Sequence, residues 1–308
     1  MDKASAIYEP MRPMGWIGQE PTDHELAWKP GVPIPRGWCE VVVSRRLSCG
    51  VQITVERRGF AIYDFAGWPL GVAHPPDTPV RTLGQVSQAA KPALIWRLRT
   101  MNSHLTLLHA AAMSRHDESP SVARVHATDL YRFDYPNEGG VGIWYRPLED
   151  ELPTAVTVAD RARFGVMPIE TFDLSLDWLD AVVANDALIE FDLLNQTQAA
   201  LATHDYALAV VAGWTVCELR VRALGSGVHG GTAQKVSKVC EALRQYGLLS
   251  EPLVRRLNGL RDCRNRWLHS GVEPGEEVAL EAVRLTTELL RFAVPDLTLR
   301  AVRGLLIL

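Results

Sequence analysis

The sequence lacks the features that mark exported, membrane-spanning and metal-binding proteins. It has no apolar run of roughly eighteen residues and no apolar core of signal-peptide type near its start. Its five cysteines are odd in number and scattered, and no Cys, His or carboxylate cluster has metal-ligand spacing. We therefore expect buried thiols in a reducing compartment, and a cytoplasmic protein with no membrane association, metal or other cofactor. The cysteines are Cys39, Cys49, Cys217, Cys240 and Cys263.

A strong charge of either sign is also missing. The 32 basic and 36 acidic residues give a net charge of −4 at pH 7, which is not typical of a protein that coats nucleic acid. Any basic surface must therefore be local. One stretch of the chain concentrates arginine, and a nucleic acid is expected to bind there. Its arginines are Arg255, Arg256, Arg261, Arg264 and Arg266.

The 308 residues suggest about two domains, and a hydrophobic content of 47% allows both to fold. The first half predicts a mostly β domain over residues 1–165, with one long helix over about 84–114. This domain is a candidate for sensing or recognition. Its tryptophans either form a recognition surface or anchor a small core. Strands are expected at residues 38–44, 51–56, 59–65, 122–134, 141–145 and 155–158, with a hairpin turn at 49–50 and an extended arm over 1–37.

From about residue 170 the pattern is entirely helical, so the chain as a whole is expected to be α+β. Short connections predict an antiparallel helical bundle over residues 170–294. The apolar tail, residues 295–308, is expected to pack on the body of the protein or on a partner. The expected helices are 174–183, 186–203, 204–224, 232–246, 250–270 and 274–292. Their expected caps are Asn185, Asp205, Thr232 and Ser250, with stops at Gly247 and Gly271 and a flexible loop over 225–231.

The helix expected at 250–270 ends in an unusual pattern. Leu253, Leu257 and Leu260 form an apolar stripe, and Arg264 takes the next position on it. Such a charge must be paired or functional, because desolvating a lone guanidinium is costly.

A second, polar stripe runs beside the first. Arg261, Asn265 and His269 follow one another at intervals of one helical turn. Together with Arg264 they form a set of groups that can bind a phosphate and transfer a proton.

These residues resemble the signature of the HEPN superfamily (higher eukaryotes and prokaryotes nucleotide-binding domains). That signature is an Arg, usually followed by a polar residue such as Asn, and then a His after four to six residues in total. It lies late in one helix of an antiparallel bundle. Here Arg264, Asn265 and His269 match it. The resemblance covers roughly residues 172–294.

The resemblance implies a metal-independent endoribonuclease. The ribose 2′-hydroxyl attacks the adjacent phosphate and leaves a 2′,3′-cyclic phosphate and a 5′-hydroxyl. His269 is then the general acid/base, Arg264 holds the scissile phosphate, Asn265 belongs to the catalytic set and Arg261 supports it. HEPN proteins often serve antiphage defence or toxin–antitoxin systems. RNA is also expected to contact Arg255, Arg256 and Arg266.

The spacing of the motif raises a geometric question. Five residues of an ideal helix turn by about 140°, so Arg264 and His269 do not share a face. Either the helix loosens at its end, or a second copy completes the site, as is common in HEPN proteins; we therefore expect a homodimer through the bundle. The structural alternative is that Arg264 pairs with a buried acid and His269 caps the helix. Glu218, on a nearly all-apolar helix, is the acid expected to pair with Arg264.

Two further functions stay open. One is a non-catalytic HEPN-like module that binds RNA, a nucleotide or a protein partner, with the protein partner held by the first domain or by the tail. The other is a structural subunit of a larger assembly that uses the bundle and the apolar tail for its contacts.

Overall fold

The structure is a computed structural model. It describes residues 5–8, 16–26, 36–65, 91–115, 124–125, 132–133, 144–145, 166–229 and 235–294. The protein is α+β, and the chain divides into two compact units. One unit comprises residues 1–121 and 125–184, and the other comprises 122–124 and 185–308.

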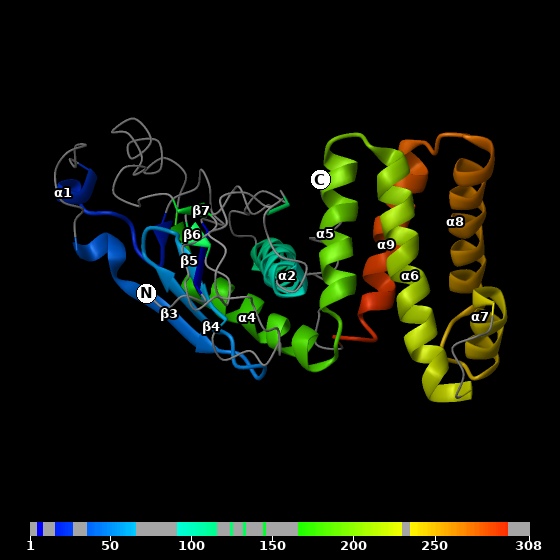
Figure 1. Cartoon of the computed structure of the whole chain (residues 1–308), viewed down its shortest axis with the longest axis horizontal. Helices are drawn as coiled ribbons and strands as arrows, with labels where there is room; N and C mark the ends of the chain where they lie inside the picture. The colour runs from blue at the N-terminus through cyan, green and yellow to red at the C-terminus, as the bar shows by residue number, and fades with distance from the viewer. Residues whose placement is uncertain are drawn as a thin grey trace. The chain divides into compact units, whose positions relative to one another are not determined.

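The first unit holds the β structure (Figure 1). Its described strands form a six-stranded sheet in the order β3-β4-β5-β1-β6-β7 and a two-stranded sheet of β2 and β8. The strands are β1 (Ser5–Tyr8), β2 (Trp16–Ile17), β3 (Val41–Arg46), β4 (Gln52–Glu56), β5 (Ala61–Asp64), β6 (Arg132–Phe133), β7 (Trp144–Tyr145) and β8 (Val166–Met167). The helices of this unit are α1 (Asp23–Leu26), the 3-10 helix η1 (Arg36–Cys39), α2 (Lys91–Arg115) and α4 (Ile169–Ala184).

The predicted hairpin is confirmed. β3 pairs antiparallel with β4, and Gly50 takes a φ of 94° in the turn, a backbone angle that glycine adopts without strain. The prediction of an extended arm over residues 1–37 is wrong at β1. This strand pairs with both β5 and β6 inside the sheet.

Two of the first four tryptophans in the sequence can be placed. Trp16 and Trp38 are buried, with ring centroids 5.4 Å apart in an edge-to-face arrangement, so they anchor the core. Trp28 and Trp68 lie outside the described residues, as do the strand expected at 155–158 and the first residues of the helix expected from 84.

The domain boundary expected between 165 and 170 differs from the division that the structure shows. Helix α4 packs on α2 and β3 and therefore belongs to the first unit, which ends at Ala184. Its polar side chains bind β3 and the turn after it: Asp180 accepts a 2.7 Å hydrogen bond from the Ser48 amide, and Asp177 forms an ion pair with Arg45.

A buried hydrogen-bonded chain crosses from the sheet through α2 to α4. Tyr63 Oη lies 2.6 Å from His104 Nδ1, and His104 Nε2 lies 3.0 Å from Ser175 Oγ. The Ser175 hydroxyl donates to the Phe172 carbonyl at 2.7 Å, so its oxygen accepts from His104 Nε2–H, and Nδ1 accepts from Tyr63. The imidazole is thereby satisfied in its neutral form. Burial lowers the pKa of His104 to about 3.

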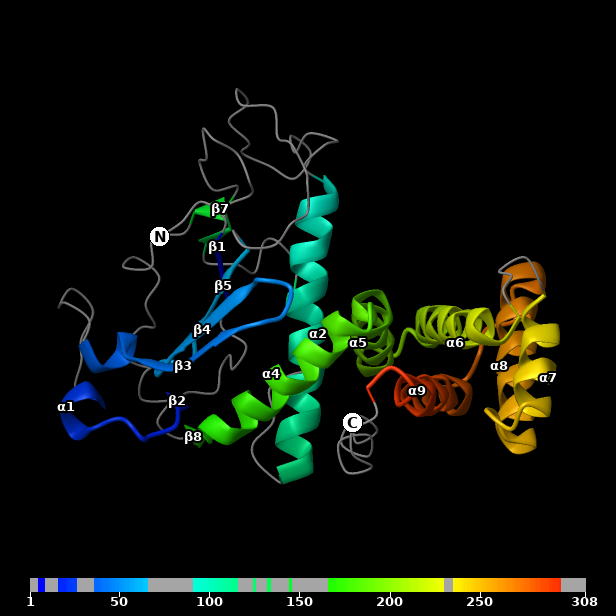
Figure 2. The same ribbon diagram turned by 90° about the horizontal axis from the view of Figure 1, so that it is seen from below.

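The second unit is helical over its described residues. Helix α6 contacts α5, α7, α8 and α9, and α9 also contacts α5 and α8 (Figures 1 and 2). The helices are α5 (Leu188–Ala202), α6 (Tyr206–His229), α7 (Val236–Gln245), α8 (Glu251–Ser270) and α9 (Glu276–Leu290). Residues 295–308 lie outside the described residues.

The predicted starts of the helices before α8 have different outcomes. Asp205 Oδ1 accepts from the Leu208 amide at 3.0 Å at the start of α6. Asn185 is not a cap, because α5 begins at Leu188 after Ala187, without a side-chain cap. Thr232 lies outside the described residues, and the residue before α7 is Lys235.

The loop expected over residues 225–231 is wrong in its first part, because α6 continues to His229. Within this helix, Gly225 allows α6 and α7 to approach closely. A Cβ at that position would lie 2.4 Å from Val239 Cγ1 of α7. Gly213 plays the same role against α9, because its Cβ would lie 2.9 Å from Ala282 Cβ.

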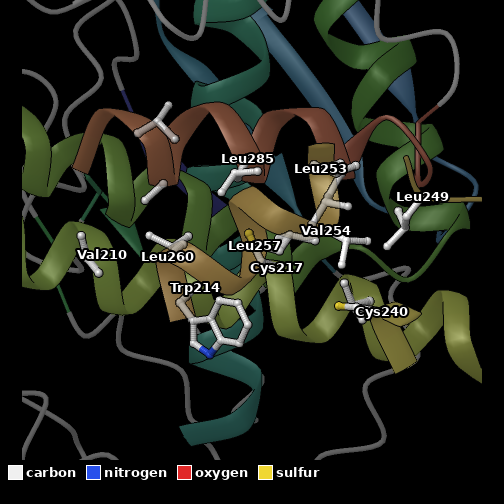
Figure 3. Close-up of a cluster of buried hydrophobic side chains, with 14 of the residues drawn as sticks. Val210, Trp214, Cys217, Cys240, Leu249, Leu253, Val254, Leu257, Leu260 and Leu285 are labelled. Atoms are coloured by element: carbon white, nitrogen blue, oxygen red, sulfur yellow. The ribbon is translucent and has the colours of Figure 1, made fainter. Parts of the chain in front are cut away.

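The interior of the second unit is an apolar cluster between α6, α7, α8 and α9 (Figure 3). Burial raises the pKa of its two thiols, Cys217 to about 12 and Cys240 to about 11. The prediction of buried thiols is confirmed for this pair only, since Cys39 is exposed and Cys49 and Cys263 are half-buried. The labelled members of the cluster are Val210, Trp214, Cys217, Cys240, Leu249, Leu253, Val254, Leu257, Leu260 and Leu285.

Within the described residues, the structure contains no helix that combines the length and apolarity needed to cross a membrane.

Candidate functional site

The motif lies on a helix whose two ends are set by local sequence. At the start of α8, Ser250 Oγ accepts from the Leu253 amide at 3.4 Å. At its end, Gly271 adopts a φ of 65°, and its amide bonds to the Trp267 carbonyl at 2.9 Å. The helix is continuous to Ser270, so it does not loosen before His269. The first of the two geometric alternatives is therefore wrong, and Arg264 and His269 leave α8 about 140° apart.

Arg264 extends the apolar face of α8, as its spacing predicts. Leu253, Leu257 and Leu260 are buried, whereas Arg264 is half-buried. Its Nε atom is enclosed without a hydrogen-bond partner, and its Nη1 donates to Asn265 Oδ1 at 3.0 Å. The guanidinium is thus held at Asn265, the residue one turn before His269 on the same face.

The expected Glu218–Arg264 pair is wrong. Glu218 binds Arg222, one turn further along α6, at 2.8 Å, and both side chains are about one-third exposed. The error arose because Glu218 lies at the edge of the apolar face of α6, where an arginine of its own helix reaches it.

The buried ion pair of the second unit joins α6 to α5 instead. Arg220 Nη2 lies 2.5 Å from Glu190 Oε1, and the two side chains are only 9% and 8% exposed. Sequence reasoning missed this pair. A signal was present, since Arg220 lies one turn after Val216 and one before Leu224 on the same apolar helix.

Among the other arginines of α8, Arg256 is bound by two carboxylates. Arg256 donates to both Glu281 and Glu288 of α9, at 2.6 and 2.7 Å. Burial alone would lower the pKa of Arg256, but these two hydrogen bonds outweigh it and raise the pKa. Because both carboxylates bind it, Arg256 links two helices, and this geometry does not favour the predicted contact with RNA.

Two other arginines of α8 have acidic partners at the surface. Arg261 Nε and Nη2 donate to Asp262 Oδ1 at 3.1 and 2.9 Å. Arg255 is mostly exposed and lies 4.0 Å from Glu251.

Arg264 and Arg266 differ from these arginines in their hydrogen-bond acceptors. Arg266 Nη2 donates to Cys263 Sγ at 3.0 Å, and Arg264 donates to Asn265. Within the described ranges, these are the two arginines of α8 to which no carboxylate is bound. Both remain able to bind an anion with most of their N–H groups.

The rest of the site is polar and accessible. Asn265 is half-buried, and His269 is exposed in the last turn of α8. The structure thus brings Arg264 to Asn265 and leaves the imidazole of His269 open to a substrate.

Two further observations delimit this site. A surface pocket of about 520 Å³ lies at the opposite end of α8, against Leu248, Leu253 and Phe292. The start of α8 is about 20 Å along the helix from the motif, so this pocket is not part of the site. In the part of the chain that the structure describes, no three His, Cys, Asp or Glu side chains are grouped to hold a metal ion.

Comparison with known proteins finds no matching family model, no matching curated protein and no matching solved structure. The resemblance to HEPN domains therefore stays a prediction from the sequence of α8.

Proposed function

We propose that the second unit is a HEPN-like helical bundle and that the protein is an endoribonuclease whose site lies on the last two turns of α8. One observation carries the proposal. Arg264 is half-buried without a carboxylate, and its guanidinium is held at Asn265, one turn before the exposed His269. A partly desolvated guanidinium is suited to binding a phosphate, and an accessible imidazole is suited to transferring a proton.

The proposed reaction needs no group beyond these side chains and water. The ribose O2′ forms a bond to phosphorus while the bond from phosphorus to O5′ breaks, giving a 2′,3′-cyclic phosphate and a 5′-hydroxyl. His269 accepts the proton of the 2′-hydroxyl, and the departing O5′ takes a proton from water. Arg264 stabilises the charge that develops on the non-bridging oxygens.

The angle between Arg264 and His269 supports a site completed by a second copy. Exposed apolar side chains lie beside the motif, with Leu268 50% and Val272 54% exposed. We propose that these residues lie in a homodimer interface. A Leu268→Asp variant is then expected to shift the protein from dimer to monomer in light scattering. A wild type that is monomeric at micromolar concentration, yet cleaves RNA, would contradict the dimer.

The activity is tested with the full-length protein, total RNA and EDTA. We expect cleavage to persist in EDTA and to fall on the order of a hundredfold or more in Arg264→Ala and in His269→Ala. Arg284→Ala is the matched control, because Arg284 is an exposed arginine on α9 near Glu281, away from the motif. Circular dichroism checks that each variant stays folded.

Equal cleavage by the wild type and both motif variants would refute the proposal. RNA binding without cleavage in all proteins would favour the alternative of a non-catalytic RNA-binding module. The proposed activity fits antiphage defence or a toxin–antitoxin system, in which the first unit would respond to the trigger.

A further inference from the structure

We propose that Arg266 is a second phosphate-binding residue of this site and that Arg261 keeps it free by occupying Asp262. The inference rests on the proposed function. It gives Arg266, which the sequence predicts to contact RNA, a defined role in binding phosphate, and it gives Arg261 a role in keeping Arg266 free. It follows from the ion pairing of three neighbouring charged residues on α8, which are Arg261, Asp262 and Arg266.

The position of Arg266 places it next to His269. The two residues are three apart, so their side chains leave the helix about 60° apart and about 4.5 Å apart along its axis. Arg264, by contrast, is about 140° from His269. Of the two arginines to which no carboxylate is bound, Arg266 therefore makes the smaller angle with His269 around the helix axis.

The state of Arg266 suits an anion. It is exposed, and its Nη2 donates a hydrogen bond to Cys263 Sγ at 3.0 Å, where the thiol sulfur is a weak acceptor. Because the residue is exposed, a phosphate oxygen can reach its remaining N–H groups and accept hydrogen bonds from them. A phosphate over His269 then has Arg266 on one side of the helix and Asn265, which binds Arg264, on the other.

Asp262 is the residue that would cancel this charge. It lies one turn before Arg266, the spacing at which a carboxylate and an arginine pair on a helix. Arg261 instead donates two hydrogen bonds to Asp262 Oδ1, at 3.1 and 2.9 Å. Removal of Arg261 releases Asp262 to bind Arg266. Arg261 is thus a positioning residue, which acts through Asp262 without touching the RNA.

The test is RNA binding in EDTA, with every variant made in a His269→Ala background so that the probe stays intact. The probe is a fluorescent single-stranded RNA of mixed sequence. We expect Arg266→Ala to weaken binding roughly tenfold and to reduce the dependence of log K on log salt concentration by about 0.7. Arg266→Lys is expected to restore the salt dependence, and Arg284→Ala to leave both quantities unchanged.

The competition for Asp262 gives a second, independent readout. We expect Arg261→Ala to weaken binding, and Asp262→Ala added to Arg261→Ala to restore it, because the freed carboxylate is then gone. A merely structural role of Arg261 predicts no such restoration.

The outcomes separate this inference from the proposed function. If Arg264→Ala weakens binding while Arg266→Ala behaves like Arg284→Ala, Arg266 has no such role and the ribonuclease proposal stands. If Arg261→Ala binds like its parent, the competition for Asp262 is refuted. If the parent protein binds no RNA, both the inference and the proposed function fail.

Discussion

The buried pair of Arg220 and Glu190 is the charge interaction whose loss we expect to unfold the second unit most readily. The two side chains join α6 to α5 at 2.5 Å and are less than one-tenth exposed. A Glu190→Ala variant leaves the guanidinium of Arg220 buried without a counter-charge. Arg220 Nε already lacks a hydrogen-bond partner, so the loss of Glu190 adds a further unpaired group to the same guanidinium.

The size of the effect follows from burial. Removing one member of a buried ion pair costs about 3–5 kcal/mol of unfolding free energy. In a unit of this size, that corresponds to a fall in Tm of roughly 10–20 °C. The surface pair of Glu218 and Arg222 is about one-third exposed, so Glu218→Ala is expected to cost only about 0.3–0.5 kcal/mol.

Thermal unfolding by circular dichroism and by calorimetry measures both variants against the wild type. A double variant, Glu190→Leu with Arg220→Met, completes the test. It replaces both charges by apolar groups of similar size and is expected to melt well above either single variant.

Two results would refute the reasoning. One is a Glu190→Ala protein that melts within about 2 °C of the wild type, which would mean that the pair is not buried as the structure shows. The other is a double variant whose loss equals the sum of the two single losses, because an uncompensated charge would then not be the cause.

Three further outcomes are expected. Because burial lowers the pKa of His104 to about 3 from an ordinary 6.5, the unfolded chain takes up the proton first. The stability that neutral His104 contributes is then complete above pH 6.5, and it falls by about 1.4 kcal/mol per pH unit between about 6.5 and 3. Urea unfolding across this pH range measures the slope. A His104→Gln variant with the same slope would contradict its assignment to His104. Gly225→Leu is expected to lower the free energy of unfolding by about 1–3 kcal/mol, because the new side chain clashes with Val239. Adding Val239→Ala is expected to restore part of this loss. If it restores none, the two helices do not touch at Gly225. Gly259 lies on the exposed face of α8, away from the helix ends, and no atom lies within 4 Å of an added methyl group. Gly259→Ala is therefore expected to raise the free energy of unfolding by about 0.5–1 kcal/mol in the same assay. A lower value than the wild type would show that this position is covered.

Much of the site could be predicted because its signals are local. The start of α8 depends on Ser250, its end on Gly271, and the face of Arg264 on the leucines one and two turns before it. These features arise within one or two turns of helix, so the sequence alone determines them. The turn at Gly50 and the hairpin around it are local in the same sense.

The identity of charge partners was predicted less well. Glu218 was assigned to Arg264, although Arg222 lies one turn away on its own helix. Spacing shows that an acid on an apolar helix needs a cation, but it does not show which cation is nearest in space. The pairing of Arg220 with Glu190, and of Arg256 with Glu281 and Glu288, depends on how α5, α6, α8 and α9 are arranged.

Only the tertiary structure decided where the helices belong and how closely they approach. An apolar face on α4 is compatible with either unit, and its contacts with α2 and β3 assign it to the first. Gly225 belongs to a glycine-rich stretch that is typical of a loop, yet it lies inside α6, where Val239 of α7 leaves no room for a side chain. The sequence by itself determined the helix of the motif and the groups it presents. The tertiary structure determined which of its arginines are neutralised by carboxylates, because ion pairing depends on distances between helices that no local pattern encodes.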